Sequence, residues 1–268
     1  MTGDIWNAQQ YLRFANDRLR PFLDLITQLD ADGEVHTVVD LGCGPGNATA
    51  LLVDWWPDAR IVGIDSSPAM IEAAAEHAAG GRVEFELGDL RDWQPAEKVE
   101  VLLANAVLQW VPDHLDLLPR LAAQLAPGGV LGFQVPGNFD APSHLALAEV
   151  KRNWAGRIPA DLARPASHDP AVYLEKLVEA GLDPDVWETT YTYLIPSDPD
   201  PAVPCGVTEF VRGSALRPAI KALGEAEAGE FVAEYDALAR QAYPVREIGG
   251  YSVQLLPYRR IFAIGRSV

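Results

Sequence analysis

A glycine-rich turn beside an acidic residue is the part of the chain best suited to chemistry. The run Val38–Asn47 is an apolar segment that ends in Asp40 and continues into Gly42, Gly44 and Gly46. Glycines between a strand and a helix let the backbone approach a ligand at the carboxyl edge of a parallel sheet. Because Asp40 places a negative charge beside that ligand, the turn predicts a site for a ligand that carries positive charge.

Two common phosphate ligands fit this turn poorly. A mononucleotide loop ends in Gly-Lys-Ser or Gly-Lys-Thr, whereas this turn ends in Gly46-Asn47-Ala48. A dinucleotide loop offers backbone N–H groups to a pyrophosphate, but Pro45 has none to offer and Asp40 would repel the phosphates. S-adenosylmethionine carries both an ammonium and a sulfonium group, so its positive charge is complementary to the negative charge of Asp40.

Further acidic residues follow the next two predicted strands. Asp65 ends the second strand, where it is placed to accept hydrogen bonds from both hydroxyls of a ribose. Asp89 follows the third strand and is placed to accept from the exocyclic amine of adenine. Together with Asp40, these acids would bind methionine, ribose and base in order. The alternative for each acid taken alone is a turn or cap residue.

Short apolar runs alternate with amphipathic segments, which predicts a parallel sheet covered by helices on both faces. The predicted strands span 35–40, 60–65, 83–86, 99–104, 130–135, 186–195 and 255–264. The predicted helices between and after them span 48–56, 68–77, 112–125 and 170–180. Pro21 is expected to split the N-terminal helical stretch. Two segments, 137–167 and 197–250, break the alternation and predict insertions that form a lid or a substrate wall.

The composition excludes several partners. The chain has 268 residues with 38 acidic against 21 basic side chains, a net charge of −17. Without a basic stripe, neither general nucleic-acid binding nor docking to anionic lipid is expected. No signal peptide and no apolar run of roughly 20 residues is found, and Cys43 and Cys205 have no metal-ligand spacing. We therefore expect a cytoplasmic protein without a metal site, and nothing in the sequence indicates its oligomeric state.

The run Val38–Asn47, with Asp65, Asp89 and Asn105, resembles the class I S-adenosylmethionine-dependent methyltransferases over about residues 35–135. The resemblance implies the α/β fold class of that family: a doubly wound, mostly parallel, Rossmann-like sheet of seven strands, the last antiparallel, with helical lid insertions. It also implies one methyltransferase domain over 1–268, made of cofactor-covering helices over 1–34, a cofactor-binding core over 35–136, and substrate-side insertions over 137–167 and 197–250.

Other segments resemble the family of bacterial trans-aconitate 2-methyltransferases, namely 6–21, 63–70, 104–114, 187–197, 216–218 and 260–262. This resemblance implies methyl transfer from S-adenosylmethionine to one carboxylate of trans-aconitate, a small polycarboxylate. A free carboxyl has a pKa of about 4, so no general base and no catalytic residue is expected beyond groups that align the reactants. Three alternatives stay open: another small carboxylic acid as acceptor, a quinone, or a non-catalytic S-adenosylmethionine-binding protein.

The cofactor contacts expected from the turn, the strand ends and the resemblance are Tyr11, Arg18, Asp40, Gly42, Gly44, Asp65, Ser66, Met70, Asp89, Leu90, Asn105 and Gln109. In this family the N-terminal helix covers the cofactor, which implies that Tyr11 touches either ligand and Arg18 meets the methionine carboxylate. The alternative is packing for Tyr11 and a surface position for Arg18.

The expected substrate contacts are Arg217, Arg260, Tyr11, Gln109, Trp110, His144 and Tyr258. Arginine is the better clamp for a carboxylate because its planar fork binds both oxygens. Arg260 shares a strand face with Tyr258, and its alternative is a solvated edge-strand position. The alternative for Arg217 is an ion pair on a helix surface, and that for Trp110 is core packing or a cofactor wall. Arg212 and Arg259 are further candidates for the carboxylate clamp. His144 and His168 are candidates as imidazolium ions, with plain polar surface as their alternative.

Overall fold

The computed structural model describes residues 15–31, 33–78, 80–159, 162 and 165–268. The described chain forms two compact units. We call them the core unit, with residues 15–136, 165–189 and 260–268, and the insert unit, with residues 137–164 and 190–259. The insert unit contains most of both segments that interrupt the strand–helix alternation in the sequence.

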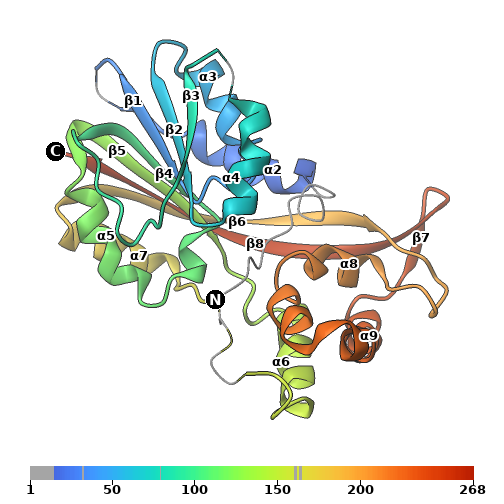
Figure 1. Ribbon diagram of the computed structural model, residues 1–268. Coiled ribbons are helices and arrows are strands. Elements are labelled where there is room, and N and C mark those ends of the chain that lie inside the picture. Colours follow the sequence, from blue (N-terminus) through green and yellow to red (C-terminus); the bar gives the residue numbers. More distant parts are fainter. Residues whose placement is uncertain (1–14, 32, 79, 160–161, 163–164) are drawn as a thin grey trace. The chain divides into compact units, whose positions relative to one another are not determined.

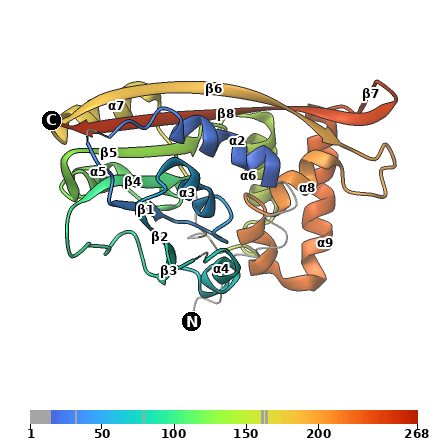
Figure 2. The ribbon, with the colours of Figure 1, turned by 90° about the horizontal axis from the view of Figure 1, so that it is seen from above.

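Five parallel strands form the centre of the core unit: β1 (Thr37–Leu41), β2 (Arg60–Asp65), β3 (Val83–Leu87), β4 (Val99–Asn105) and β5 (Leu125–Pro136). Strand β8 (Tyr251–Ser267) pairs antiparallel with β5. Next to it lies β6 (Leu182–Pro196), which makes the order β3-β2-β1-β4-β5-β8-β6, and the short β7 (Arg246–Ile248) pairs with β8. Figure 2 shows β8 between β5 and β6. The predicted mostly parallel sheet with an antiparallel last strand is confirmed.

Helices cover both faces of this sheet. Figure 1 shows α2 (Ala15–Ile26), α3 (Leu52–Trp55) and α4 (Pro68–Ala74) on one face, and α5 (His114–Ala122) and α7 (Pro170–Glu179) on the other. Short 3-10 turns at Thr49–Leu51, Ala75–His77 and Leu108–Trp110 complete the connections. The central strands β1 and β4 are mainly apolar because both of their faces are buried. Val38, Val101 and Leu131, for example, are fully buried.

Of two helix features predicted from the sequence, the cap at Ser67 is confirmed and the break at Pro21 is not. Ser67 caps α4 as expected, because its hydroxyl accepts a hydrogen bond from the backbone N–H of Met70 at 3.2 Å. The expected break at Pro21 is wrong, since α2 runs through it. A proline inside a helix costs about 3 kcal/mol. Here Phe22 and Leu25 are fully buried, and their packing compensates for that cost.

The insert unit is built around α6 (Pro142–Asn153), α8 (Gly206–Arg212) and α9 (Arg217–Ala242). Helix α6 packs against α9. The hydroxyl of Tyr235 donates to the carbonyl of Ser143, and the hydroxyl of Tyr243 accepts from the N–H of Ser143, at 3.2 Å each. Both bonds are buried, so they tie the start of α6 to the second half of α9.

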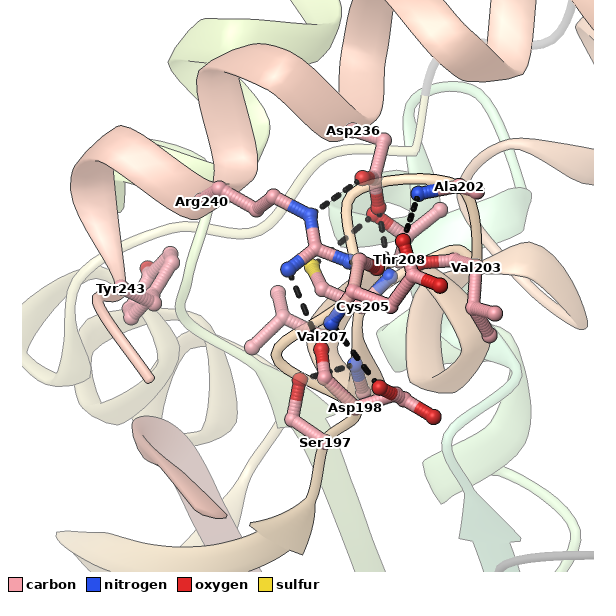
Figure 3. A network of polar contacts seen from close by, with 12 residues as sticks. Ser197, Asp198, Ala202, Val203, Cys205, Val207, Thr208, Asp236, Arg240 and Tyr243 are labelled. Carbon is pink, nitrogen blue, oxygen red and sulfur yellow. Dashed lines mark hydrogen bonds and ion pairs between the residues drawn. The ribbon is translucent and has the colours of Figure 1, made fainter. Parts of the chain in front are cut away.

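An arginine anchors the loop that precedes α8 (Figure 3). The Nε of Arg240 donates to Asp236 at 2.8 Å, and its other nitrogens donate to the carbonyls of Asp198 and Asp200 at 3.1 and 3.0 Å. Asp236 also accepts from the backbone N–H of Cys205 at 2.7 Å. The loop is therefore held to α9 by bonds to its backbone.

Among the described residues, no helix combines the length and apolar character needed to cross a bilayer.

Candidate functional site

A cavity of about 260 Å3 opens where the central strands of the core unit end at their carboxyl edge. Its wall comes from the segments that follow β1, β2, β3 and β4. The wall includes these residues expected as ligand contacts: Gly42, Gly44, Asp65, Ser66, Met70, Asp89, Leu90, Asn105 and Trp110. Side chains from four strand ends therefore meet at one cavity, and their roles toward a ligand stay predictions.

The two glycines on the cavity wall, Gly42 and Gly44, have different structural roles. Gly42 has a φ of +76°, and a Cβ there would lie 2.4 Å from Cγ2 of Val107, so this position needs a residue without a side chain. Gly44 has a φ of +57°, and a Cβ there would meet nothing within 4 Å. The first glycine allows close packing against the turn after β4, whereas the second presents bare backbone to the cavity.

Asp65 accepts hydrogen bonds from the backbone of two chain segments. One carboxylate oxygen accepts from the N–H of Gly44 and the other from the N–H of Ser67, at 2.9 Å each. These bonds join the glycine turn to the start of α4. Each carboxylate oxygen has two lone pairs, so the bonds to backbone do not saturate the group. Asp65 lines the cavity, and its expected contact with ribose hydroxyls stays a prediction.

Asp40 is a buried anion beside the glycine turn. Its side chain is only 2% exposed; Oδ2 accepts from the hydroxyl of Thr49 at 2.6 Å, and Oδ1 has no hydrogen-bond partner among the described residues. Burial raises the pKa of Asp40 to about 6, the bond from Thr49 opposes the rise, and the charge of Asp65 adds to it. Asp40 does not line the cavity. A cationic ligand in front of the turn would compensate this incompletely satisfied charge, so the site fits S-adenosylmethionine.

Asp89 has a partner that the local sequence pattern does not single out. Nε of Arg91 donates to both oxygens of Asp89 at 3.0 Å, and the backbone N–H of Arg91 donates to the same group at 2.9 Å. These bonds hold the pKa of Asp89 below its usual value. Arg91 also lines the cavity. The carboxylate therefore stays ionised, and an adenine amine would share it with Arg91. The only sequence signal is a basic residue two positions after the acid.

The turn after β4 is strained. Ala106 lines the cavity with a φ of +53°, a region that residues other than glycine rarely occupy. Nε2 of Gln109 donates to the carbonyl of Ala106 at 2.6 Å, and the N–H of Ala106 donates to the carbonyl of Gln134 at 2.9 Å. Gln109 is 5% exposed and does not line the cavity. It therefore holds the turn, and the expected direct contact with a ligand finds no support in its position.

Arg260 is buried, and its expected contact with a substrate carboxylate stays a prediction. It lies on β8 within the core unit, it is 5% exposed, and it is not on the cavity wall. Its Nη1 donates to Oε1 of Gln134 on β5 at 3.4 Å. The solvated edge-strand alternative is wrong, because β8 lies between β5 and β6. A direct clamp on a ligand in this cavity would require a side chain on its wall.

Among the described residues, three further expected contacts are not on the cavity wall: Arg217, Tyr258 and His144. Arg217 begins α9 and is half-buried, and Tyr258 packs among aromatic rings of the insert unit. Burial lowers the pKa of His144 to about 4, so the imidazole is neutral at pH 7 without a ligand, and its expected role as an imidazolium beside a substrate carboxylate stays a prediction. Tyr11 lies outside the described residues, and so does the side chain of Arg18.

Comparison with known proteins identifies related sequences. The family described as "Methyltransferase domain" matches residues 38–129. A trans-aconitate 2-methyltransferase of Streptomyces avermitilis is 46% identical over 97% of this chain and 96% of its own. Proteins of the same name are 43% identical in an Azoarcus species and 40% identical in Escherichia coli O157:H7, each over 97% of this chain and 98% of theirs.

Solved structures share the fold at much lower identity. The YcgJ protein of Bacillus subtilis has a TM-score of 0.59 and 16% identity, over 94% of this chain and 98% of its own. A geranyl diphosphate C-methyltransferase of Streptomyces coelicolor, solved with S-adenosyl-L-homocysteine, has a TM-score of 0.52 and 16% identity, over 93% of this chain and 77% of its own. Identities this low establish the fold alone.

Proposed function

Because the chain belongs to the trans-aconitate 2-methyltransferase family, we propose that it methylates one carboxylate of trans-aconitate, giving the monomethyl ester and S-adenosylhomocysteine. It is an S-adenosylmethionine-dependent methyltransferase, with S-adenosylmethionine as its cofactor. The observation that carries the proposed substrate is the 40–46% identity to relatives of that name over nearly the whole chain. No described feature favours a quinone or a purely regulatory role.

The cofactor residues are assigned by their chemistry. When bound, S-adenosylmethionine supplies an electrophilic methyl group on a sulfonium. We propose that Gly44 lets the methionine part lie against bare backbone, that Asp65 accepts from the ribose hydroxyls, and that Asp89 accepts from the adenine amine. Asp40 balances the positive charge. The acceptor carboxylate is already ionised at neutral pH, so these residues contribute by binding and alignment, without proton transfer.

Donor affinity is expected to depend on the ionisation of Asp40. Its pKa of about 6 leaves it mostly ionised at pH 7.5 and mostly protonated at pH 5. Protonation removes the negative charge that the cationic donor needs, so the dissociation constant should rise about tenfold between these pH values. Calorimetry on the ligand-free protein measures this rise. In Asp40→Asn the affinity should be lower and nearly independent of pH, and an equal pH dependence in both proteins would contradict the role.

Arg217 is proposed as a contact for a substrate carboxylate. It is a half-buried cation at the first position of α9, where the helix dipole also favours an anion. A hydrogen bond to a charged group contributes about 1.5–3 kcal/mol. Arg217→Ala should therefore raise the KM for trans-aconitate roughly 10- to 100-fold and leave donor affinity nearly unchanged. Arg152→Ala, which removes an exposed arginine of α6 in the same unit, is the matched control. An unchanged KM in Arg217→Ala would remove this residue from the site.

The substrate is tested by incubating the protein with labelled S-adenosylmethionine and trans-aconitate. The expected product is a labelled monomethyl ester, identified by mass spectrometry. Other small di- and tricarboxylic acids and a quinone are tested in parallel, and trans-aconitate should have the highest kcat/KM. Absence of transfer at millimolar trans-aconitate would refute the proposal. Donor binding without transfer to any acceptor would favour a non-catalytic protein.

A further inference from the structure

Three polar side chains form a chain of hydrogen bonds across neighbouring strands of the core unit. Arg260 is on β8, Gln134 is on β5, and Asn105 ends β4 on the cavity wall. Nη1 of Arg260 donates to Oε1 of Gln134 at 3.4 Å, and Nε2 of Gln134 donates to Oδ1 of Asn105 at 2.9 Å. Arg260 and Gln134 are 5% and 1% exposed. A buried polar chain of this kind therefore ends at the candidate donor site.

The sheet register explains why these residues meet. Asn105 lies directly opposite Gln134 in the parallel pair of β4 and β5. Arg260 is opposite Pro136 in the antiparallel pair of β5 and β8, which makes it a diagonal neighbour of Gln134. Diagonal neighbours on one sheet face lie within reach of long side chains. The contacts thus follow from the strand order, and no local sequence motif joins the three positions.

The chain of bonds has only one chemically consistent direction. A guanidinium donates hydrogen bonds and accepts none. Gln134 must therefore turn its oxygen toward Arg260, which leaves its NH2 group to face Asn105. Asn105 must in turn direct its oxygen toward Gln134. The opposite orientation of either amide would place two donors or two acceptors face to face in a buried environment, at a cost of about 1–3 kcal/mol for each unsatisfied group.

We propose that Arg260 and Gln134 are positioning residues that orient the Asn105 amide so that its N–H groups face the donor cavity and bind a ligand carboxylate. The amide nitrogen of Asn105 is on the opposite side of its planar group from the oxygen that Gln134 holds. Asn105 itself lines the cavity. An asparagine amide can turn either its oxygen or its NH2 group toward a ligand. In the proposed orientation, Asn105 presents only hydrogen-bond donors to the cavity.

The strand order indicates which ligand group these donors meet. Along the sheet edge the order is Asp89 after β3, Asp65 at the end of β2, the glycine turn after β1, and then Asn105. If base, ribose and methionine follow the first three, Asn105 stands at the methionine end, where an acceptor receives the methyl group. Two ligand carboxylates are expected near this end of the site: one of the acceptor and that of the methionine part of the donor. For the acceptor carboxylate, the inference rests on the proposed function.

The decisive substitution is Gln134→Glu, which keeps the shape of the side chain. A glutamate has only acceptors, so Arg260 keeps a partner while the NH2 of Asn105 must turn toward the new carboxylate. The oxygen of Asn105 then faces the cavity and opposes a ligand carboxylate. The expected result is a roughly 10- to 100-fold weaker binding of that ligand. A raised KM for trans-aconitate with unchanged donor affinity assigns the acceptor, and weaker donor binding by calorimetry assigns the methionine.

Two further comparisons separate orientation from a general effect of the new charge. In an Asn105→Ala background, Gln134→Glu should add only a few-fold change, because the amide through which it acts is missing. Arg260→Lys keeps a residue that only donates and should preserve most binding, whereas Arg260→Gln can also accept and should lose it. Unfolding midpoints confirm that each variant is folded. Full additivity in the Asn105→Ala background would overturn the proposal.

The orientation of the Asn105 amide can also be measured by NMR on the ligand-free protein, so this test does not depend on the identity of the substrate. The side-chain NH2 signal of Asn105 in a 15N NMR spectrum is identified by its loss in Asn105→Ala. It should move downfield in Gln134→Glu, because that NH2 then donates to a carboxylate. An unmoved signal overturns the orientation whatever the acceptor is. Absence of transfer to trans-aconitate by the unchanged protein would instead refute the proposed function alone.

Discussion

Asp65→Ala is expected to weaken the binding of S-adenosylmethionine by about 100-fold or more. The carboxylate holds the N–H groups of Gly44 and Ser67 at 2.9 Å each, and it is the proposed acceptor for the ribose hydroxyls. A hydrogen bond to a charged group contributes about 1.5–3 kcal/mol. The loss of the two proposed bonds from the ribose hydroxyls therefore already accounts for this factor. The substitution removes a ligand contact and the link between the glycine turn and α4 at once. Calorimetry with the ligand-free protein measures the change.

Two controls make the result specific. Asp65→Asn keeps one accepting oxygen, so it can hold only one of the two backbone groups and should give an intermediate loss. Asp183→Ala removes an exposed aspartate from β6 in the same unit and should leave donor affinity unchanged. If Asp65→Ala bound the donor as tightly as the unchanged protein, the ribose role would have to be withdrawn.

Gly42→Ala is expected to lower the free energy of unfolding by about 2 to 5 kcal/mol. A side chain at positive φ costs about 1–2 kcal/mol, and overpacking adds about 1–3 kcal/mol. Crowding is severe here, because the new Cβ would lie 2.4 Å from Cγ2 and 2.5 Å from Cβ of Val107. The atoms closest to the backbone cannot swing away, so the turn after β1 or the turn after β4 must shift. Denaturant unfolding measures the loss.

Gly181 and Gly44 supply matched comparisons for this prediction. Both have positive φ, at +80° and +57°, and a Cβ at either would meet nothing within 4 Å. Gly181→Ala should therefore show only the backbone cost, with normal donor affinity. Gly44→Ala should show a similar loss of stability together with weaker donor binding, because its Cβ would occupy the cavity wall. Equal stability losses in Gly42→Ala and Gly181→Ala would contradict the crowding argument.

The amino-acid sequence by itself determined the features that depend on residues close together in the chain. The glycine turn, Asp40 before it and the acids at the next two strand ends are all local patterns, and parallel strands bring their carboxyl ends to one edge wherever the strands lie. The cap at Ser67 has the same local character. This is why local spacing alone is enough to place Asp65 and Asp89 at the candidate site.

Only the tertiary structure decided the roles that depend on burial and strand order. Burial makes His144 neutral near pH 7, and packing carries α2 through Pro21. Arg260 is buried because β8 is inserted between β5 and β6, and the same insertion brings it to Gln134. Gln134 carries no signal in the sequence, since it is one polar residue in an apolar strand. Its partners are 29 and 126 positions away, and hydrogen bonds over such separations are set by how strands pair and not by local spacing.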